Sequence, residues 1–231
     1  YCQVNINCSP EGDNWQDQKQ SSVRTLISNY WCSAAVINNT AQDCSPYVLT
    51  AFHCQQGISS NQFNQGIFYL NYYAPSCNNP SFEGTLDNTT MVGCSVVAGS
   101  NDNGGSSGSD YALFQLNNPI PQSYNTFYSG WNANNIASSS GASLHHPSGD
   151  IMKISTYTSN LQSASWGSGN GSHWRVYWSS TANGHGVTEG GSSGAPIYDS
   201  QGRIMGQLTG GSSYCQTPNS PDLYGKMSYN W

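Results

Sequence analysis

Residues 67–73 read Ile-Phe-Tyr-Leu-Asn-Tyr-Tyr, and this stretch indicates the fold class most directly. β-branched and aromatic side chains are typical of strands, because they pack well on a pleated surface. Similar apolar segments recur at short intervals, with turn residues between them. They span residues 31–37, 47–50, 91–98, 111–116, 127–131, 151–157, 174–178, 195–198, 204–208 and 223–227. The sequence therefore predicts an all-β protein.

The composition agrees with this prediction. Only 8% of the residues are charged, whereas helical surfaces usually carry many more Glu, Lys and Arg. Hydrophobic residues make up 36% of the chain, which is enough for a packed core. With 231 residues, the chain has the length of one large domain or of two small ones.

Polar segments divide the chain into parts. The stretch 117–121, Asn-Asn-Pro-Ile-Pro, interrupts regular structure and is the best candidate for a connection between two halves. Residues 99–109 contain only Gly, Ser, Asn and Asp and are expected to form a mobile surface loop. Residues 167–172 are expected to form another exposed loop. Asp-Ser-Gln-Gly at 199–202 predicts a hairpin turn.

Charge excludes some classes of partner. Six Lys and Arg against twelve Asp and Glu give a formal net charge of −6, and no cluster of basic residues marks a nucleic-acid interface. No apolar run approaches the roughly 18 residues of a membrane-spanning helix. We therefore expect a soluble monomer that binds neither nucleic acid nor a membrane.

The eight cysteines are even in number and lack Cys-x-x-Cys spacing, which argues for four disulfides rather than a zinc site. Disulfides persist in oxidising compartments outside the cytoplasm. The chain begins at Tyr1 rather than at Met, so a signal peptide and any pro-segment are expected to have been removed. The sequence predicts a secreted, extracellular protein.

Ser193 lies in the segment Gly-Gly-Ser-Ser-Gly-Ala-Pro at 190–196. Glycines around a serine allow tight backbone turns and a close approach of a substrate carbonyl. The N–H groups of Gly191 and Ser193 can then converge on one oxygen as an oxyanion hole. The alternative is a Gly/Ser turn without function, and this chain has many such turns.

His53 ends the apolar segment Leu-Thr-Ala-Phe-His-Cys at 49–54, where a neighbouring disulfide can fix a general base. Asp110 precedes an apolar strand and is therefore drawn inward, so its carboxylate can accept the His Nδ1–H. Each has an ordinary alternative, a histidine at the edge of the core or a loop aspartate such as Asp102. The order His53, Asp110, Ser193 is, however, a specific signal for a catalytic triad.

Three of these segments resemble the sequence boxes of trypsin-like serine peptidases. Residues 49–54, 110–116 and 191–196 are similar to the boxes that carry the His, Asp and Ser of that family. Further matches to its bacterial lysyl endopeptidase branch occur at 8–12, 142–147, 186–194, 206–211 and 222–225. The resemblance implies two antiparallel β-barrels of the trypsin-like fold, with the active site between them.

The family's organisation implies an N-terminal barrel with an extension in residues 1–120, which carries His53 and Asp110. Residues 121–231 then form a C-terminal barrel with Ser193 and the specificity pocket. The implied reaction is hydrolysis of polypeptide substrates through an acyl-enzyme, without a metal or an organic cofactor.

The resemblance also implies a substrate pocket. Asp222 matches the aspartate at the base of the lysyl endopeptidase pocket, and a carboxylate there favours a cationic side chain. Gly210 and Gly211 would line the pocket. The sequence has Thr209 where the family carries a histidine, and Trp166 matches the tryptophan stacked near that histidine. At most half of the stack is therefore expected.

Several alternatives stay open. The leading expectation is cleavage after Lys, but a carboxylate attracts the side chains of both Lys and Arg, so a peptidase that cleaves after either residue is the alternative. Asp222 can also be an exposed turn residue without a role in the pocket. Abundant Tyr, Trp and Asn would suit a non-enzymatic sugar-binding module, although that class predicts a damaged triad. Ser192 stands where animal relatives carry an aspartate that pairs with a freed N-terminus, so activation by such an ion pair is not expected.

The cysteines can be paired as Cys2–Cys215 and Cys8–Cys77 from the resemblance, Cys32–Cys54 from their position beside the histidine, and Cys44–Cys94 as the remaining pair. The last bridge is absent from the family's usual three. His145 and His146 are adjacent, and neighbouring residues of a strand point to opposite faces. No third ligand has recognisable spacing, so no metal site is expected.

Overall fold

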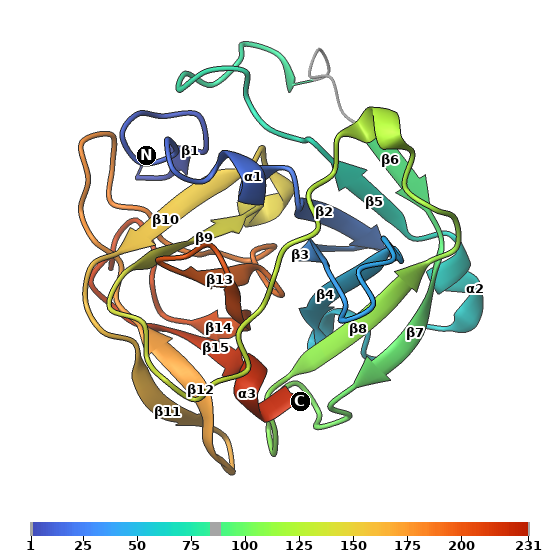
Figure 1. Cartoon of the computed structure of the whole chain (residues 1–231). Helices are drawn as coiled ribbons and strands as arrows, with labels where there is room; N and C mark the ends of the chain where they lie inside the picture. Colours follow the sequence, from blue (N-terminus) through green and yellow to red (C-terminus); the bar gives the residue numbers. More distant parts are fainter. Residues whose placement is uncertain (1, 84–88, 231) are drawn as a thin grey trace.

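The computed structural model describes residues 2–83 and 89–230, and it confirms the all-β prediction with two antiparallel sheets that lie side by side (Figure 1). The seven-stranded sheet has the order β6-β5-β2-β3-β4-β8-β7. Its strands are β2 (Ser22–Ile27), β3 (Tyr30–Ile37), β4 (Tyr47–Ala51), β5 (Ile67–Leu70), β6 (Thr89–Val92), β7 (Cys94–Gly99) and β8 (Tyr111–Leu116).

The eight-stranded sheet has the order β1-β10-β9-β13-β14-β15-β12-β11. Its strands are β1 (Val4–Asn5), β9 (Gly141–His145), β10 (Lys153–Tyr157), β11 (Gln162–Trp166), β12 (Gly169–Val176), β13 (Pro196–Asp199), β14 (Ile204–Gly211) and β15 (Asp222–Lys226). Strand β1 comes from the start of the chain and pairs with β10, so the first residues lie on the second sheet.

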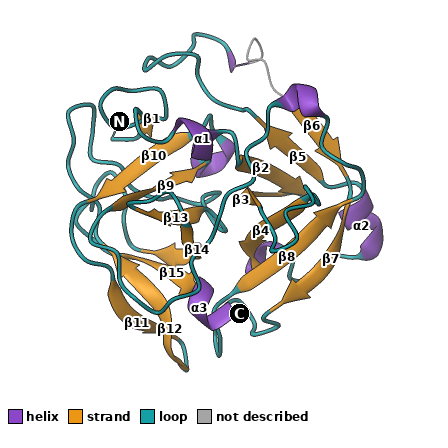
Figure 2. Ribbon diagram, viewed as in Figure 1, coloured by secondary structure: helices purple, strands orange, loops and turns teal. Residues whose placement is uncertain are grey.

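Short helices connect the strands (Figure 2). The α-helices are α1 (Gln16–Lys19), α2 (Ser60–Asn64) and α3 (Met227–Asn230), and the 3-10 turns are η1 (Phe52–Cys54), η3 (Gln122–Tyr124) and η4 (Pro147–Gly149). Within the described residues, no helix has both the length and the apolar character that crossing a bilayer requires.

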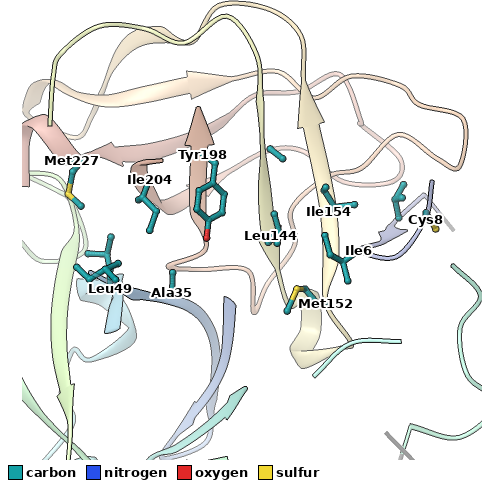
Figure 3. Packing of buried hydrophobic residues seen from close by; sticks show 13 residues of the cluster. Ile6, Cys8, Ala35, Leu49, Leu144, Met152, Ile154, Tyr198, Ile204 and Met227 are labelled. Carbon is teal, nitrogen blue, oxygen red and sulfur yellow. The ribbon is translucent and has the colours of Figure 1, made fainter. Parts of the chain in front are cut away.

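Strand β3 joins two hydrophobic cores, because side chains alternate along a strand. Ala34 and Val36 belong to the core of the seven-stranded sheet, whereas Ala35 and Ile37 belong to a cluster between the sheets. Figure 3 shows this second cluster, in which Ala35 and Leu49 come from one sheet and Leu144, Tyr198 and Ile204 from the other. The apolar contact packs the two sheets against each other.

Backbone geometry explains where expected strands differ from the observed ones. Strand β5 ends at Leu70 rather than at residue 73, because Asn71 has a φ of 59°. Gly93, with a φ of 81°, divides the expected strand 91–98 into β6 and β7. Residues 127–131 form isolated bridges instead of a regular strand.

The two expected exposed loops are confirmed only in part, because residues 100–109 and 167–168 lie outside regular structure and include exposed positions. Residues 167–172 belong to the β11–β12 hairpin, whose second strand already begins at Gly169. Within residues 99–109, Asp102 and Ser109 are buried. The expected hairpin turn at 199–202 is confirmed, because β13 and β14 pair on either side of it.

Three of the four expected disulfides are present in the described part of the chain, namely Cys2–Cys215, Cys8–Cys77 and Cys32–Cys54. The expected Cys44–Cys94 bridge is wrong, since both residues are free thiols. Cys94 begins β7 with its side chain in the core of the seven-stranded sheet, whereas Cys44 is exposed in the loop before β4. The two side chains therefore occupy different environments.

Candidate active site

His53 and Asp110 meet where the interior strands β4 and β8 of the seven-stranded sheet end and begin. Strand β4 ends at Ala51 directly opposite Tyr111, the first residue of β8, so the residues that follow and precede them are neighbours. His53 Nδ1 lies 2.6 Å from Asp110 Oδ2, and the His53 backbone N–H donates to Asp110 Oδ1 at 2.9 Å. The carboxylate is fully buried, whereas the histidine side chain is 30% exposed. This arrangement fixes the imidazole with Nε2 free for proton transfer.

Asp102 holds the backbone of Asp110 in an unusual conformation. Asp110 has a φ of 58°, in the left-handed region that non-glycine residues rarely adopt. Its N–H donates to Asp102 Oδ2 at 2.8 Å, and Asp102 Oδ1 accepts the N–H of Gly105 at 2.9 Å. The interpretation of Asp102 as an ordinary loop aspartate was therefore wrong. Its position in a polar loop gave no sequence signal for this role.

Ser193 is held against the seven-stranded sheet by its backbone. The Ser193 carbonyl accepts the N–H of Ser33 at 2.8 Å, and the Sγ of Cys54 lies 3.7 Å from the same oxygen. Ser193 therefore lies beside the residue that follows His53. Among the described residues, Ser193 Oγ and His53 form no direct hydrogen bond, a contact that is often long before substrate binds.

The N–H groups of Gly191 and Ser193 are oriented by the carbonyls of the same peptide units. Gly190 O accepts from the N–H of Ser148 at 2.5 Å, and Ser192 O accepts from the N–H of Ala195 at 2.9 Å. Because N–H and C=O point in opposite directions in a trans peptide, both N–H groups point away from these partners. Neither has an intramolecular acceptor within the described chain. Gly191 has a φ of 90°, which explains the glycine.

A pocket of about 260 Å³ opens beside Ser193. Its lining residues are Trp166, Thr188, Glu189, Gly190, Ser193, Leu208, Gly210, Gly211, Ser213 and Tyr214. The expected lining residues Trp166, Gly210 and Gly211 are therefore brought together. Glu189 was missed by sequence reasoning, although it lies within the segment 186–194 that resembles the family.

Asp222 is completely buried behind the pocket wall rather than on its surface. Its Oδ2 accepts hydrogen bonds from Trp178 Nε1, Thr188 Oγ1 and Ser213 Oγ at 2.7, 2.7 and 2.5 Å. Its Oδ1 accepts the Ser213 N–H at 3.1 Å. Burial raises the pKa of Asp222, and these hydrogen bonds oppose that rise. The alternative of an exposed turn aspartate was wrong.

An imidazole lies beside Trp166, but it belongs to His173, which sequence reasoning did not consider and which lies just before the expected strand 174–178. His173 of β12 packs on Trp166 with ring centres 6.2 Å apart and an angle of 32° between the planes. His173 Nε2 lies 2.9 Å from Thr209 Oγ1. The expectation of at most half a stack did not include this ring, because His173 occupies a different position in the sequence from the family's histidine. Burial lowers the pKa of His173 to about 4.

His145 and His146 contact different neighbours. The ring of His145 lies between two serines, and that of His146 lies 3.0 Å from the carbonyl of Asp150. Across the described residues, no group of three His, Cys, Asp or Glu side chains has the arrangement of a metal site.

Comparison with known proteins supports the resemblance read from the sequence. The family model of the lysyl endopeptidase C-terminal domain matches residues 1–225. The structure is similar to the Rv3671c protease of M. tuberculosis H37Rv in its inactive form, with a TM-score of 0.56 at 13% identity over 93% of this chain and 87% of that one. It is also similar to Deg5, with a TM-score of 0.57 at 14% identity over 93% and 87% of the two chains. The fold is therefore that of trypsin-like serine peptidases, and the chain belongs to the lysyl endopeptidase family.

Proposed function

We propose that this protein is a secreted serine endopeptidase that cleaves polypeptides on the carboxyl side of Lys. The observation that carries the proposal is the hydrogen bond between His53 and the fully buried Asp110, in a family of serine peptidases. Three disulfides support an extracellular location. In this proposal residues 1–120 supply His53 and Asp110, and residues 121–231 supply Ser193 and the pocket.

In the proposed reaction, Ser193 Oγ attacks the scissile carbonyl while its proton passes to His53 Nε2. Asp110 stabilises the resulting imidazolium through the Nδ1–H, and the N–H groups of Gly191 and Ser193 bind the oxyanion. His53 then protonates the leaving amine. A water molecule repeats these steps on the acyl-enzyme, giving its proton to His53 and releasing Ser193.

The hydrogen bonds of the pocket support a preference for Lys. Thr188 Oγ1 and Ser213 Oγ both donate their protons to Asp222, so only their lone pairs are left to face a ligand. The Lys ammonium has three donors and no acceptor, and it matches these two oxygens together with the carboxylate of Glu189. A bidentate contact between Arg and Asp222 would need free oxygens on that carboxylate. Asp222 is already occupied by four donors.

Peptide anilides that differ only in having Lys, Arg or Leu before the scissile bond test the proposal. We expect hydrolysis of the Lys substrate to be fastest, and covalent labelling of Ser193 by a fluorophosphonate to be lost in His53→Ala. Equal rates for Lys and Arg would support the broader peptidase. A wild-type protein that neither hydrolyses the anilides nor takes the label would contradict a peptidase and favour the binding module.

A further inference from the structure

Ser192 does not face the pocket, and its side chain is completely buried. It lies between Gly191 and Ser193, whose N–H groups form the proposed oxyanion hole. Ser192 Oγ is 2.8 Å from Nδ1 of His145, the last residue of β9. The other ring nitrogen, Nε2, lies 3.1 Å from the Oγ of Ser155 on β10. A buried imidazole therefore connects the loop to two paired strands.

The hydrogen bonds among His145, Ser155 and Ser192 can have only one assignment of donors and acceptors. Ser155 Oγ donates its only proton to the carbonyl of Val187 at 3.1 Å, so it accepts from the Nε2–H of His145. The neutral ring then has a free lone pair at Nδ1, which accepts the proton of Ser192 Oγ. Ser192 Oγ in turn accepts the N–H of Glu189 at 3.3 Å. Burial lowers the pKa of His145 to about 3, which keeps the ring neutral and Nδ1 an acceptor.

The residues that follow His145 hold the backbone of the same loop. The N–H of Ser148 donates to Gly190 O at 2.5 Å. The N–H of His146 donates to Ser33 Oγ at 2.9 Å, and this hydroxyl donates to Gly191 O at 3.0 Å. Residues 145–148 therefore bind Gly190 O and the Ser192 side chain directly, and they bind Gly191 O through the hydroxyl of Ser33.

We propose that His145 is a positioning residue for catalysis, which through Ser192 fixes the orientation of the Ser193 N–H relative to that of Gly191. The inference rests on the proposed peptidase function. Loss of the contact leaves Ser192 without its acceptor and lets the 192–193 peptide rotate, so the donors no longer converge on the transition state. The hydrogen bonds that hold the Ser192 hydroxyl in place all come from neutral groups. In this proposal the loop is therefore oriented without an ion pair to a chain terminus.

The test compares Ser192→Ala and His145→Leu, which remove the contact, with His145→Asn, which keeps an acceptor near the position of Nδ1. Tyr157→Phe is the control, because it removes another buried hydrogen bond of β10, to Tyr198 O at 2.9 Å, away from the loop. We expect kcat for the Lys anilide to fall about 10- to 100-fold in the first two variants, less than the loss of a whole oxyanion donor. KM should change less than about twofold, His145→Asn should recover part of kcat, and the control should keep it.

Two further measurements separate positioning from general damage. A peptide aldehyde forms a tetrahedral adduct with Ser193, so its affinity should fall in the variants by the same factor as kcat. Butylamine occupies only the pocket, so its affinity should not change. If His145→Leu does not fold, Ser192→Ala decides, since it removes one oxygen atom. An unchanged kcat in Ser192→Ala, or equal losses for aldehyde and butylamine, would overturn the inference. An inactive wild-type protein would instead refute the peptidase function on which it rests.

Discussion

At the scale of single residues, the pocket divides its negative charge between a buried aspartate and a partly exposed glutamate. Asp222 accepts four hydrogen bonds and is fully buried, whereas Glu189 lies on the pocket surface. A fixed, desolvated carboxylate contributes more to selectivity than a screened one at the rim. The buried residue should therefore dominate the choice of substrate, and the rim residue should modulate it.

We expect Asp222→Asn to lower kcat/KM for the Lys anilide at least about 30-fold, since removing one partner of a buried charge contact costs about 2–5 kcal/mol. The amide NH₂ must also face a hydroxyl that donates to the native carboxylate. Glu189→Gln should lower kcat/KM about tenfold or less. The ratio of the Lys to the Leu anilide reports selectivity. A larger loss in Glu189→Gln than in Asp222→Asn would refute this division of roles.

Asp102 acts on Asp110 rather than on a substrate. Both of its oxygens accept a buried backbone N–H, and an amide offers only one oxygen. We expect Asp102→Asn to lower the free energy of unfolding by about 1–3 kcal/mol, the cost of an unsatisfied buried group, and to lower kcat as Asp110 relaxes. Urea unfolding and anilide kinetics measure the two effects. Asp17→Asn, at an exposed position, is the control and should change neither.

At the scale of elements, the loop that carries Ser193 packs against strands β3 and β4, and its backbone comes closest to them at Gly194. A Cβ atom added to Gly194 would lie 2.1 Å from Thr50 Oγ1 and 2.5 Å from Ser33 O, and the residue has a φ of 80°. We expect Gly194→Ala to destabilise the fold by several kcal/mol, about 3 or more. Gly190→Ala is the matched control, because no atom lies within 4 Å of its added Cβ. Equal melting temperatures for the two variants would contradict this account.

Sequence periodicity predicted strands with a clear apolar alternation, and it missed strand β2 (Ser22–Ile27) as well as strands made largely of small polar residues. Strand β8 was predicted with its exact bounds, because Ala112, Phe114 and Leu116 alternate with less buried residues. Strands β9 and β11 read Gly-Ala-Ser-Leu-His and Gln-Ser-Ala-Ser-Trp, which resemble loops in composition. Pairing with neighbouring strands makes them strands, and a single sequence does not contain that information.

The candidate site divides in the same way. The proposed triad could be predicted from the sequence because each residue adjoins an apolar segment and the three follow a known order. The supporting residues were not predictable. His145 and His173 act through partners distant in the chain, and Asp102 lies in a polar loop that gave no signal of its contacts with Gly105 and Asp110. His173 is an example, since it reaches Thr209 only because β12, β15 and β14 are neighbours in the sheet.

At the scale of the whole molecule, two cysteines take no part in the three disulfides, and the thiol of Cys44 is exposed whereas that of Cys94 is buried. Burial raises the pKa of Cys94 to about 12, so the native thiol is both inaccessible and protonated. We expect a thiol reagent such as DTNB to react with one cysteine of the native chain, Cys44, and with two in guanidinium chloride. Cys44→Ser should abolish the native reaction. No reaction in guanidinium chloride would indicate the fourth disulfide instead.

The buried histidines make the stability of the whole fold depend on pH. Burial lowers the pKa values of His145 and His146 to about 3 and that of His173 to about 4, whereas an unfolded histidine titrates near about 6.5. Between these values the unfolded chain binds protons that the folded chain does not, so the free energy of unfolding falls as the pH falls. The contribution is complete above about pH 6.5 and decreases by about 2 kcal/mol per histidine at pH 5.

Three such histidines amount to a loss of about 6 kcal/mol, which is comparable with the whole stability of many domains. We therefore expect urea unfolding at pH 7, 6 and 5 to show a steep loss of stability before the carboxylates titrate. The slope should correspond to an uptake of nearly three protons on unfolding. His146→Asn should reduce that uptake by about one, whatever its effect on the stability at pH 7. A stability that is constant from pH 7 to 5 would mean that these imidazoles become protonated within the fold, which their burial opposes.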